Sequence, residues 1–241
     1  MELNAPGFRP LYRQVQELFR QRIADGTWRP GQALPAEPRL AAELNVSQGT
    51  VRKALDELAA QSILVRHQGR GTFVAEHTEE TAMFRFFRLA ADDGSRLLPT
   101  SRVLSCAVER AAPRAQDRLG LGQGDAVVAI RRLRLLADRP AIYEFIAAPA
   151  ELFPGLAELG DDLPNTLYDL YQRRWGVTIG RAVERLKAVP APLAEAEALG
   201  AGPGDPLLEI DRVAQDLEGR AVEWRVSHCR CDTLHYESVL E

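Results

Sequence analysis

The last two thirds of the chain contain an internal repeat. Residues 119–133, LGLGQGDAVVAIRRL, align with residues 199–213, LGAGPGDPLLEIDRV, at a constant offset of 80 residues. In each copy the pattern predicts a short helix ending at glycine, a Gly-Asp turn, a strand, and a hairpin that returns to Glu144 or Glu223. Two copies are too few for a solenoid. We therefore expect two similar halves in one sheet with approximate two-fold symmetry, the two glutamates at matching positions.

Alternation along the first repeated strand places Arg132 and Arg134 on one face, among apolar residues. In the second copy, Arg212 matches Arg132. Two guanidinium groups in an apolar setting are costly unless carboxylates or a bound anion satisfy them, and Glu144 is a candidate partner. Arginine forks suit carboxylate or phosphate. The residues alone leave two readings open, namely a pocket for a small polar metabolite and a set of internal salt bridges that closes the sheet.

Residues 34–75 predict a helix, a tight turn, a second helix and a basic hairpin. Apolar stripes at helical spacing lie on both sides of a break at Asn45 and Val46. Ser47 is placed to cap the second helix, in which no glycine or proline occurs from Thr50 to Ser62. The hairpin that follows carries a Gly-Arg-Gly tip. This order is typical of a winged helix-turn-helix, whose second helix fits the major groove.

Projecting the second helix at 100° per residue places polar side chains opposite its apolar stripe. Arginine can donate two hydrogen bonds to guanine, and glutamine can make two with adenine. A solvated basic face is the alternative interpretation, but three helices followed by a cationic hairpin favour nucleic-acid binding. We expect DNA contacts from Ser47, Gln48, Gly49, Thr50, Arg52, Lys53, Gln68, Gly69, Arg70 and Gly71.

The segment from Pro10 to Ala75 resembles the GntR superfamily of bacterial transcription regulators, through PLYRQVQELFRQRIADGTWRPGQALP, VSQGTVRKAL and QGRGTFVA. The family commonly has arginine where this chain has Pro38 and Gln48, and we expect Arg39 to replace the first. The second departure predicts a preference shifted from guanine toward adenine at one operator position. The resemblance also implies a homodimer on a short palindromic operator.

Residues 83–241 look like the UTRA domain of the HutC branch of this superfamily, which is related in fold to chorismate lyase. The resemblance is carried by PTSRVL, IRRLRLL, PAIYEF, NTLYDLY and AVEWRVSHCRCD. The family often has serine where Thr166 stands, so the hydroxyl is retained and a phosphorylated ligand is one option. The resemblance implies that the effector pocket is lined or bordered by Ser101, Arg132, Arg134, Glu144, Thr166, Tyr168, Glu223 and Arg230.

Charge is divided unevenly along the chain, whose formal net charge is −4. Residues 1–75 carry ten Lys and Arg against seven Asp and Glu, while the remainder carries twenty against twenty-seven. A head with a net charge of +3 gives a modest attraction to phosphates, so one copy should bind DNA weakly and with strong salt dependence. Two heads on a paired scaffold would raise the affinity through effective concentration.

Composition is ordinary for a soluble globular protein, with 46% hydrophobic and 27% charged residues. The first residues, MELNAPGFRPLYRQ, lack the apolar core of a signal peptide, and no stretch is apolar enough to span a bilayer. Three cysteines, an odd number, predict reduced thiols. We therefore expect a cytoplasmic protein with no membrane partner.

Two other motifs have simpler explanations than a ligand site. His228-Cys229-Arg230-Cys231 and His235 contain metal-ligand residue types, but structural zinc usually takes two to four residues between cysteines. We expect strand packing there, and neither a metal nor a cofactor. The aromatic cluster from Phe84 to Arg88 could stack RNA bases, but without a repeat it is better interpreted as the first strand of the second domain.

We expect an α+β chain in which residues 1–75 form the winged helix-turn-helix, residues 76–82 a linker, and residues 83–241 a UTRA domain with a mostly antiparallel sheet that binds effector and dimerises. The function predicted is a transcription regulator, a repressor rather than an activator, whose operator binding is controlled by a small polar or anionic metabolite. An enzyme of lyase-like fold is the rival class, but no recognisable nucleophile motif supports it. An architectural DNA binder without an effector is the third alternative.

Overall fold

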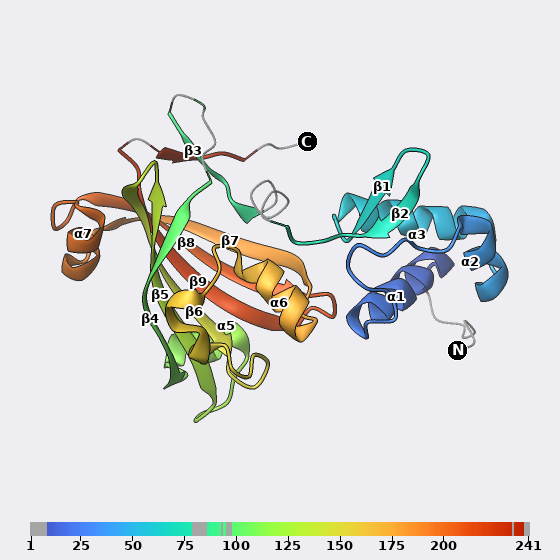
Figure 1. The fold of residues 1–241 in the computed structure, drawn as a ribbon, viewed down its shortest axis with the longest axis horizontal. Coiled ribbons are helices and arrows are strands. Elements are labelled where there is room, and N and C mark those ends of the chain that lie inside the picture. Colours follow the sequence, from blue (N-terminus) through green and yellow to red (C-terminus); the bar gives the residue numbers. More distant parts are fainter. Residues whose placement is uncertain (1–8, 79–85, 93, 95–97, 233, 239–241) are drawn as a thin grey trace.

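The structure is a computed structural model that describes residues 9–78, 86–92, 94, 98–232 and 234–238. A small helical head lies beside a larger unit built on one broad sheet, and an extended segment connects the two (Figure 1). Phe84, Arg85 and residues 79–82 of the expected linker lie outside the described residues. None of the described helices is long and apolar enough to cross a membrane.

The head consists of α1 (Leu11–Ala24), α2 (Glu37–Leu44), α3 (Gln48–Ala60) and the hairpin of β1 (Leu64–His67) and β2 (Gly71–Val74). One apolar cluster unites the three helices with β1 and β2. Asn45 takes a left-handed conformation at the turn between α2 and α3, with φ of 52°. The predicted cap is confirmed, since the Ser47 Oγ accepts a hydrogen bond from the Thr50 amide at 3.1 Å. The second helix begins directly after this cap, at Gln48, as expected, and it ends at Ala60, two residues before Ser62.

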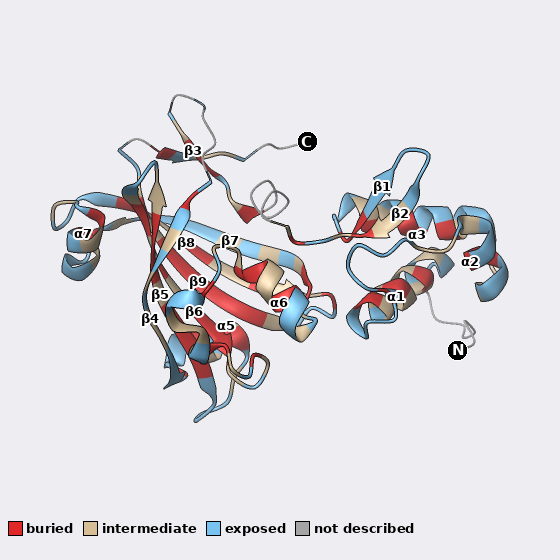
Figure 2. Ribbon diagram, viewed as in Figure 1, coloured by how far each residue is buried: buried red, intermediate tan, exposed pale blue. Residues whose placement is uncertain are grey.

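The larger unit is built on a six-stranded antiparallel sheet in the order β4-β5-β6-β9-β8-β7. Its strands are β4 (Thr100–Arg110), β5 (Ala126–Leu136), β6 (Arg139–Pro149), β7 (Ile179–Pro190), β8 (Pro206–Asp216) and β9 (Ala221–Arg230). The first three strands and the last three mirror each other across the β6–β9 pair. The two central strands are largely buried and the edge strands β4 and β7 are more exposed (Figure 2).

The internal repeat is confirmed in detail. Helix α5 (Pro113–Leu119) and helix α7 (Leu193–Leu199) lie 80 residues apart, as do β5 and β8. Both helices end at a left-handed glycine, Gly120 with φ of 66° and Gly200 with φ of 64°. In both turns an aspartate, Asp125 or Asp205, accepts a hydrogen bond of 2.7 Å from the amide of the glycine three residues earlier. The same local signals therefore build the same backbone twice.

One detail of the expected repeat is wrong, because Glu223 does not match Glu144. Arg132 pairs in register with Glu144, and its counterpart Arg212 pairs in register with Arg225. The β8–β9 connection is longer than the β5–β6 connection, whereas both hairpins have a bulge at the equivalent position, after Arg134 in the first and after Ala214 in the second. Strand β9 is therefore displaced by two residues relative to the expected match. Glu223 lies on the expected face of the sheet, but Arg225 occupies the position that corresponds to Glu144.

Alternation along the strands divides the core into two layers, as expected. The 3-10 helix η1 (Ala157–Asp162) and helix α6 (Leu167–Trp175) cover the face that carries Val128, Ile130 and Ile146. Helices α5 and α7 cover the opposite face, where α5 packs on β9 and α7 packs on β6. A separate two-stranded sheet consists of β3 (Leu89–Ala91) and β10 (Leu234–Tyr236). It packs against the α6 face of the large sheet, near the start of β6 at Ile142. The described part of the aromatic cluster, Phe86 to Arg88, precedes β3 rather than forming that strand.

Candidate effector pocket and DNA-contacting face

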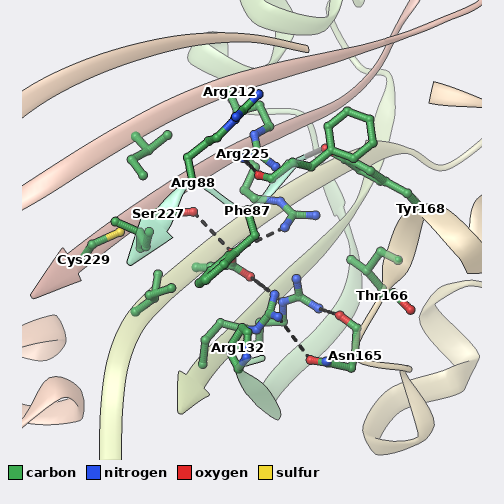
Figure 3. Close-up of a pocket in the computed structure, with 18 of the residues that line it drawn as sticks. Phe87, Arg88, Arg132, Asn165, Thr166, Tyr168, Arg212, Arg225, Ser227 and Cys229 are labelled. Atoms are coloured by element: carbon green, nitrogen blue, oxygen red, sulfur yellow. Dashed lines mark hydrogen bonds and ion pairs between the residues drawn. The ribbon is translucent and has the colours of Figure 1, made fainter. Parts of the chain in front are cut away.

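A pocket of about 750 Å³, counted out to its mouth, opens on the α6 face of the sheet. Strands β5, β6, β8 and β9 form its floor, the start of α6 forms one wall, and residues 86–89 form another (Figure 3). Its polar lining comprises Arg88, Arg132, Arg134, Glu144, Asn165, Thr166, Tyr168, Arg212, Arg225, Ser227, Cys229 and Tyr236.

Glu144 stands at the centre of the charged floor and is only 5% exposed. Its carboxylate accepts hydrogen bonds from the Arg132 Nε at 2.5 Å, the Arg225 Nη1 at 3.4 Å and the Ser227 Oγ at 3.4 Å. Figure 3 labels the three donors, Arg132, Arg225 and Ser227. Burial raises the pKa of Glu144, but the neighbouring guanidinium groups outweigh it and hold that pKa well below its usual range.

A second carboxylate lies beneath the pocket wall. Glu223 is fully buried and accepts hydrogen bonds from the hydroxyls of Tyr168 at 3.1 Å and Tyr171 at 3.0 Å. Arg225 donates to the same carboxylate through Nε and Nη2, both at 3.0 Å. Burial and the charge of Glu223 raise the pKa of Tyr168 to about 12, so both tyrosines remain donors at neutral pH. Arg225 thus links the two carboxylates.

Arg134 is the least satisfied of the buried cations that line the pocket. Its Nη2 donates to the Asn165 Oδ1 at 3.2 Å and its Nη1 lies 3.5 Å from Glu144, but its buried Nε has no hydrogen-bond partner within the described residues. Burial lowers the pKa of Arg134 to about 9, and the adjacent Arg132 and Arg225 add to the shift. A buried, under-paired guanidinium beside other cations favours an incoming anion.

The formal charge of the ion pairs around the pocket also favours a bound anion. Arg132, Arg134 and Arg225 share Glu144 and Glu223. A fourth arginine of the pocket, Arg212, is paired with Glu184 from β7. These four arginines face three carboxylates, which leaves one positive charge uncompensated, and the exposed Arg88, also of the lining, adds a second.

The eight residues predicted for the effector site fall into three groups. Five of them line the pocket: Arg132, Arg134, Glu144, Thr166 and Tyr168. Two others support it from behind, since the Ser101 Oγ donates to the Asn165 Oδ1 at 2.9 Å and Glu223 holds Tyr168.

Arg230 does neither of these things. Its side chain is paired with Asp232 and donates to the Leu199 carbonyl at the end of α7, at 3.2 Å. Arg230 is not among the residues that line the pocket.

Sequence reasoning missed several lining residues. Arg225 and Ser227 follow Glu223 at alternate positions of β9, so the same face rule applied to that strand would have found them. Asn165 directly precedes Thr166 in the motif already singled out. Arg88 comes from the segment before β3, and no local pattern in the sequence points to it.

The predicted DNA contacts lie at the surface of the head. All of them are exposed except Thr50, which is half-buried. Arg39 lies on α2, the wing tip lies between β1 and β2, and the others lie at the start of α3. A side chain added at Gly49 would meet only the Ser47 Oγ, at 3.8 Å, so the backbone there is open to close approach.

Two of these cations already have partners inside the head. The Arg52 Nε donates to the Glu37 carboxylate at 2.9 Å. Lys53 places its Nζ 3.9 Å from the centre of the Tyr12 ring of α1. Lys53 is thus turned toward α1 by a cation–π contact.

The segment after the wing is anchored to the larger unit. The His77 amide donates to the Gln172 Oε1 at 3.0 Å, and the His77 Nε2 accepts from the Ile179 amide at 3.1 Å. Gln172 also donates to the Ala75 carbonyl and to the Thr178 hydroxyl. Because Gln172 belongs to α6, the helix that walls the pocket also holds the connection to the head.

The fold and the two candidate sites are typical of a DNA-binding regulator with a ligand pocket, and comparison with known proteins leads to the same class. The family model for bacterial regulatory proteins of the gntR family matches residues 11–74, and the model for the UTRA domain matches residues 95–235. The chain belongs to the GntR family and carries a UTRA domain. It is a transcription regulator rather than an enzyme, as its curated relatives are.

Two curated relatives are similar over nearly their whole length. The chain is 32% identical over 240 residues to the HTH-type transcriptional repressor NagR of Bacillus subtilis, covering 98% of each chain. It is 32% identical over 222 residues to the mannosyl-D-glycerate transport/metabolism system repressor MngR of Escherichia coli, covering 90% of each. Among solved structures, the ligand-binding domain of a GntR-family regulator from Bordetella bronchiseptica is 35% identical with a TM-score of 0.62, covering 65% of this chain and 98% of that one.

Proposed function

We propose that the chain is a repressor whose hold on its operator is weakened by a small anionic metabolite bound in the pocket on the α6 face. The observation that carries this proposal is the buried Arg134, whose Nε lacks a partner while its charge is opposed by its neighbours. A carboxylate or phosphate would supply the missing acceptor. The relatives named as repressors support the sign of regulation, and mannosyl-D-glycerate, in the name of one of them, carries a carboxylate.

The division of labour that we propose follows the expected boundaries. Residues 1–75 bind DNA, residues 76–82 link the domains, and residues 83–241 bind effector and pair two copies. The apolar core of the head is separate from the clusters of the sheet, apart from Leu217, which supports this division. A homodimer in the cytoplasm on a palindromic operator would place two weakly cationic heads on one site.

The DNA-binding surface that we propose consists of Arg39, residues 47–50, Arg52, Lys53 and residues 68–71. The effector site consists of the five lining residues already predicted, with Ser101 and Glu223 as supports and Asn165, Arg212, Arg225 and Ser227 added. Arg230 belongs to this site only if its contact with Asp232 is broken.

Coupling between the sites runs through α6 in this proposal. Its first turn walls the pocket at Thr166 and Tyr168, and its Gln172 holds the linker at Ala75 and His77. An effector that shifts α6 would move the point at which the head is held. For release of DNA, the effector must bind the DNA-incompetent arrangement more tightly, and the operator must then weaken effector binding by the same factor.

A ligand panel tests the proposal. The full chain is heated with sugar acids, sugar phosphates and their uncharged parent sugars, and every compound that raises Tm is then tested for its effect on operator binding. We expect stabilisers to be anionic and to weaken operator binding. The proposal is wrong if only uncharged sugars stabilise the protein, or if no stabilising compound changes its affinity for DNA.

A further inference from the structure

One carboxylate of the head accepts hydrogen bonds from two residues of the proposed DNA-binding surface, Arg52 and Gln48, and from Arg66 of the wing. Glu37, in the first turn of α2, accepts from the Arg52 Nε at 2.9 Å, the Arg66 Nη1 at 3.3 Å and the Gln48 Nε2 at 3.4 Å. These donors come from α3 and from the first strand of the wing. Burial raises the pKa of Glu37, but the hydrogen bonds from Arg52 and Gln48 outweigh it and lower the pKa, so the group is ionised at neutral pH.

The contact decides which edge of Arg52 faces outward. Because Nε is engaged by Glu37, the two terminal nitrogens form the free edge, and neither has a partner within the described part of the chain. The side chain is 57% exposed, so this edge is accessible. Two parallel N–H groups match the O6 and N7 acceptors of guanine.

The same contact decides the orientation of the Gln48 amide. A carboxylate only accepts hydrogen bonds, so the amide must turn its NH₂ group toward Glu37 and its Oε1 away. The outward Oε1 can accept from the amino group of adenine or cytosine, but it repels the two acceptors of guanine. If the amide were free to rotate, its NH₂ group could serve guanine as well.

We propose that Glu37 is a positioning residue that sets base preference at two neighbouring operator positions. Through it, Arg52 presents donors to a guanine while Gln48 presents an acceptor to a base with an amino group. This inference rests on the proposed DNA-binding surface. The inference gives a role in base recognition to a residue whose negative charge is unfavourable for binding DNA. Glu37 would lower the affinity for the phosphate backbone while it increases the discrimination between bases.

The test is unbiased operator selection with the full chain and with Glu37→Gln. The amide variant removes the charge and can donate to the Gln48 Oε1, so the Gln48 amide is free to flip. We expect guanine to become accepted at the position read by Gln48, and the ratio of operator affinity to random-DNA affinity to fall about tenfold, the value of one good base contact. Affinity for random DNA should stay equal or rise.

The matched control is Glu43→Gln, which removes another carboxylate of α2. The Glu43 Oε1 lies 2.6 Å from the Arg22 Nη2 of α1 and is not paired with α3. We expect it to leave base preference unchanged. Glu37→Asp serves as a second variant, since it keeps the charge but draws it back by one methylene, and it should also broaden the position read by Gln48.

Three results would overturn the inference. One is an unchanged base preference in Glu37→Gln. Another is wild-type preference in Glu37→Asp, which would make charge rather than position the cause. The third is an equal loss of operator and random-DNA binding together with a lower Tm, which would mean that Glu37 only stabilises the head. Failure of the wild-type chain to select any sequence would instead refute the proposed function.

Discussion

The two halves of the six-stranded sheet share a backbone but differ in what they place on the α6 face. Where the first half has Glu144, the second has Arg225, and where the first has Arg134, the second has Ala214. Caps and turns repeat because they determine the chain path, as at Gly120 and Gly200. The pocket is therefore made by departures from the repeat. Matched substitutions in the two halves can separate scaffold from site.

The largest effect is expected from Glu144→Gln. The change leaves Arg132, Arg134 and Arg225 without their shared anion in a buried setting. Breaking a buried ion pair in this way costs about 3–5 kcal/mol. Urea denaturation should show a fall of that size in the free energy of unfolding. As control, Glu109→Gln removes the half-exposed pair with Arg131 on the first strand pair and should cost less than about 1 kcal/mol.

Acid titration sharpens this prediction. The folded-state pKa of Glu144 lies below its unfolded value, so its contribution is present above the unfolded pKa of about 4.5 and is lost as pH falls through the folded pKa. Below the unfolded pKa, the stability of Glu144→Gln should therefore approach that of the wild type. Two parallel curves from pH 7 down to acid unfolding would contradict the assignment.

Arg134→Ala copies the residue of the second half into the first. The variant loses the under-paired guanidinium, so an anionic effector should bind more weakly by about 1.5–3 kcal/mol, while operator affinity stays unchanged. Calorimetric titration with the anion found in the panel measures the loss. Arg131→Ala on the opposite face of the same strand is the control, and equal losses in both variants would contradict a specific role for Arg134.

The smallest effect concerns the shared scaffold. Gly120→Ala and Gly200→Ala each force a side chain into a left-handed cap, although neither added Cβ meets a neighbour within 4 Å. Each change should lower the free energy of unfolding by about 1–2 kcal/mol. Because the two sites are equivalent, the two costs should be equal. A clear inequality would show that the repeat is less symmetric in energy than in geometry.

Local signals in the sequence were enough to predict the repeat and the helix cap. Glycine caps, Gly-Asp turns and strand alternation act over a few residues, so the faces of Arg132 and Arg134 were predicted correctly. The register of β9 against β8 was not predicted correctly, because the longer β8–β9 connection places Arg225 rather than Glu223 opposite Arg212. No periodic pattern reveals the length of a bulged hairpin.

Contacts between distant segments were also out of reach. Arg88 enters the pocket from the segment before β3, and Glu37 gathers donors from α3 and the wing. Both depend on packing between elements far apart in the chain. Arg230 was assigned to the pocket by resemblance, but its neighbour Asp232 holds it at the end of α7.

The packing of α5 and α7 on opposite halves of the sheet has a consequence for how the larger unit folds. Each helix packs on a central strand of the opposite half, α5 on β9 and α7 on β6. A polypeptide containing one half alone would keep the contacts of its helix with its own strands, such as those of Leu119 with Val127, but would lose those with the opposite half. The duplicated halves are thus interlocked, and we expect the sheet to fold as one cooperative unit rather than as two independent halves.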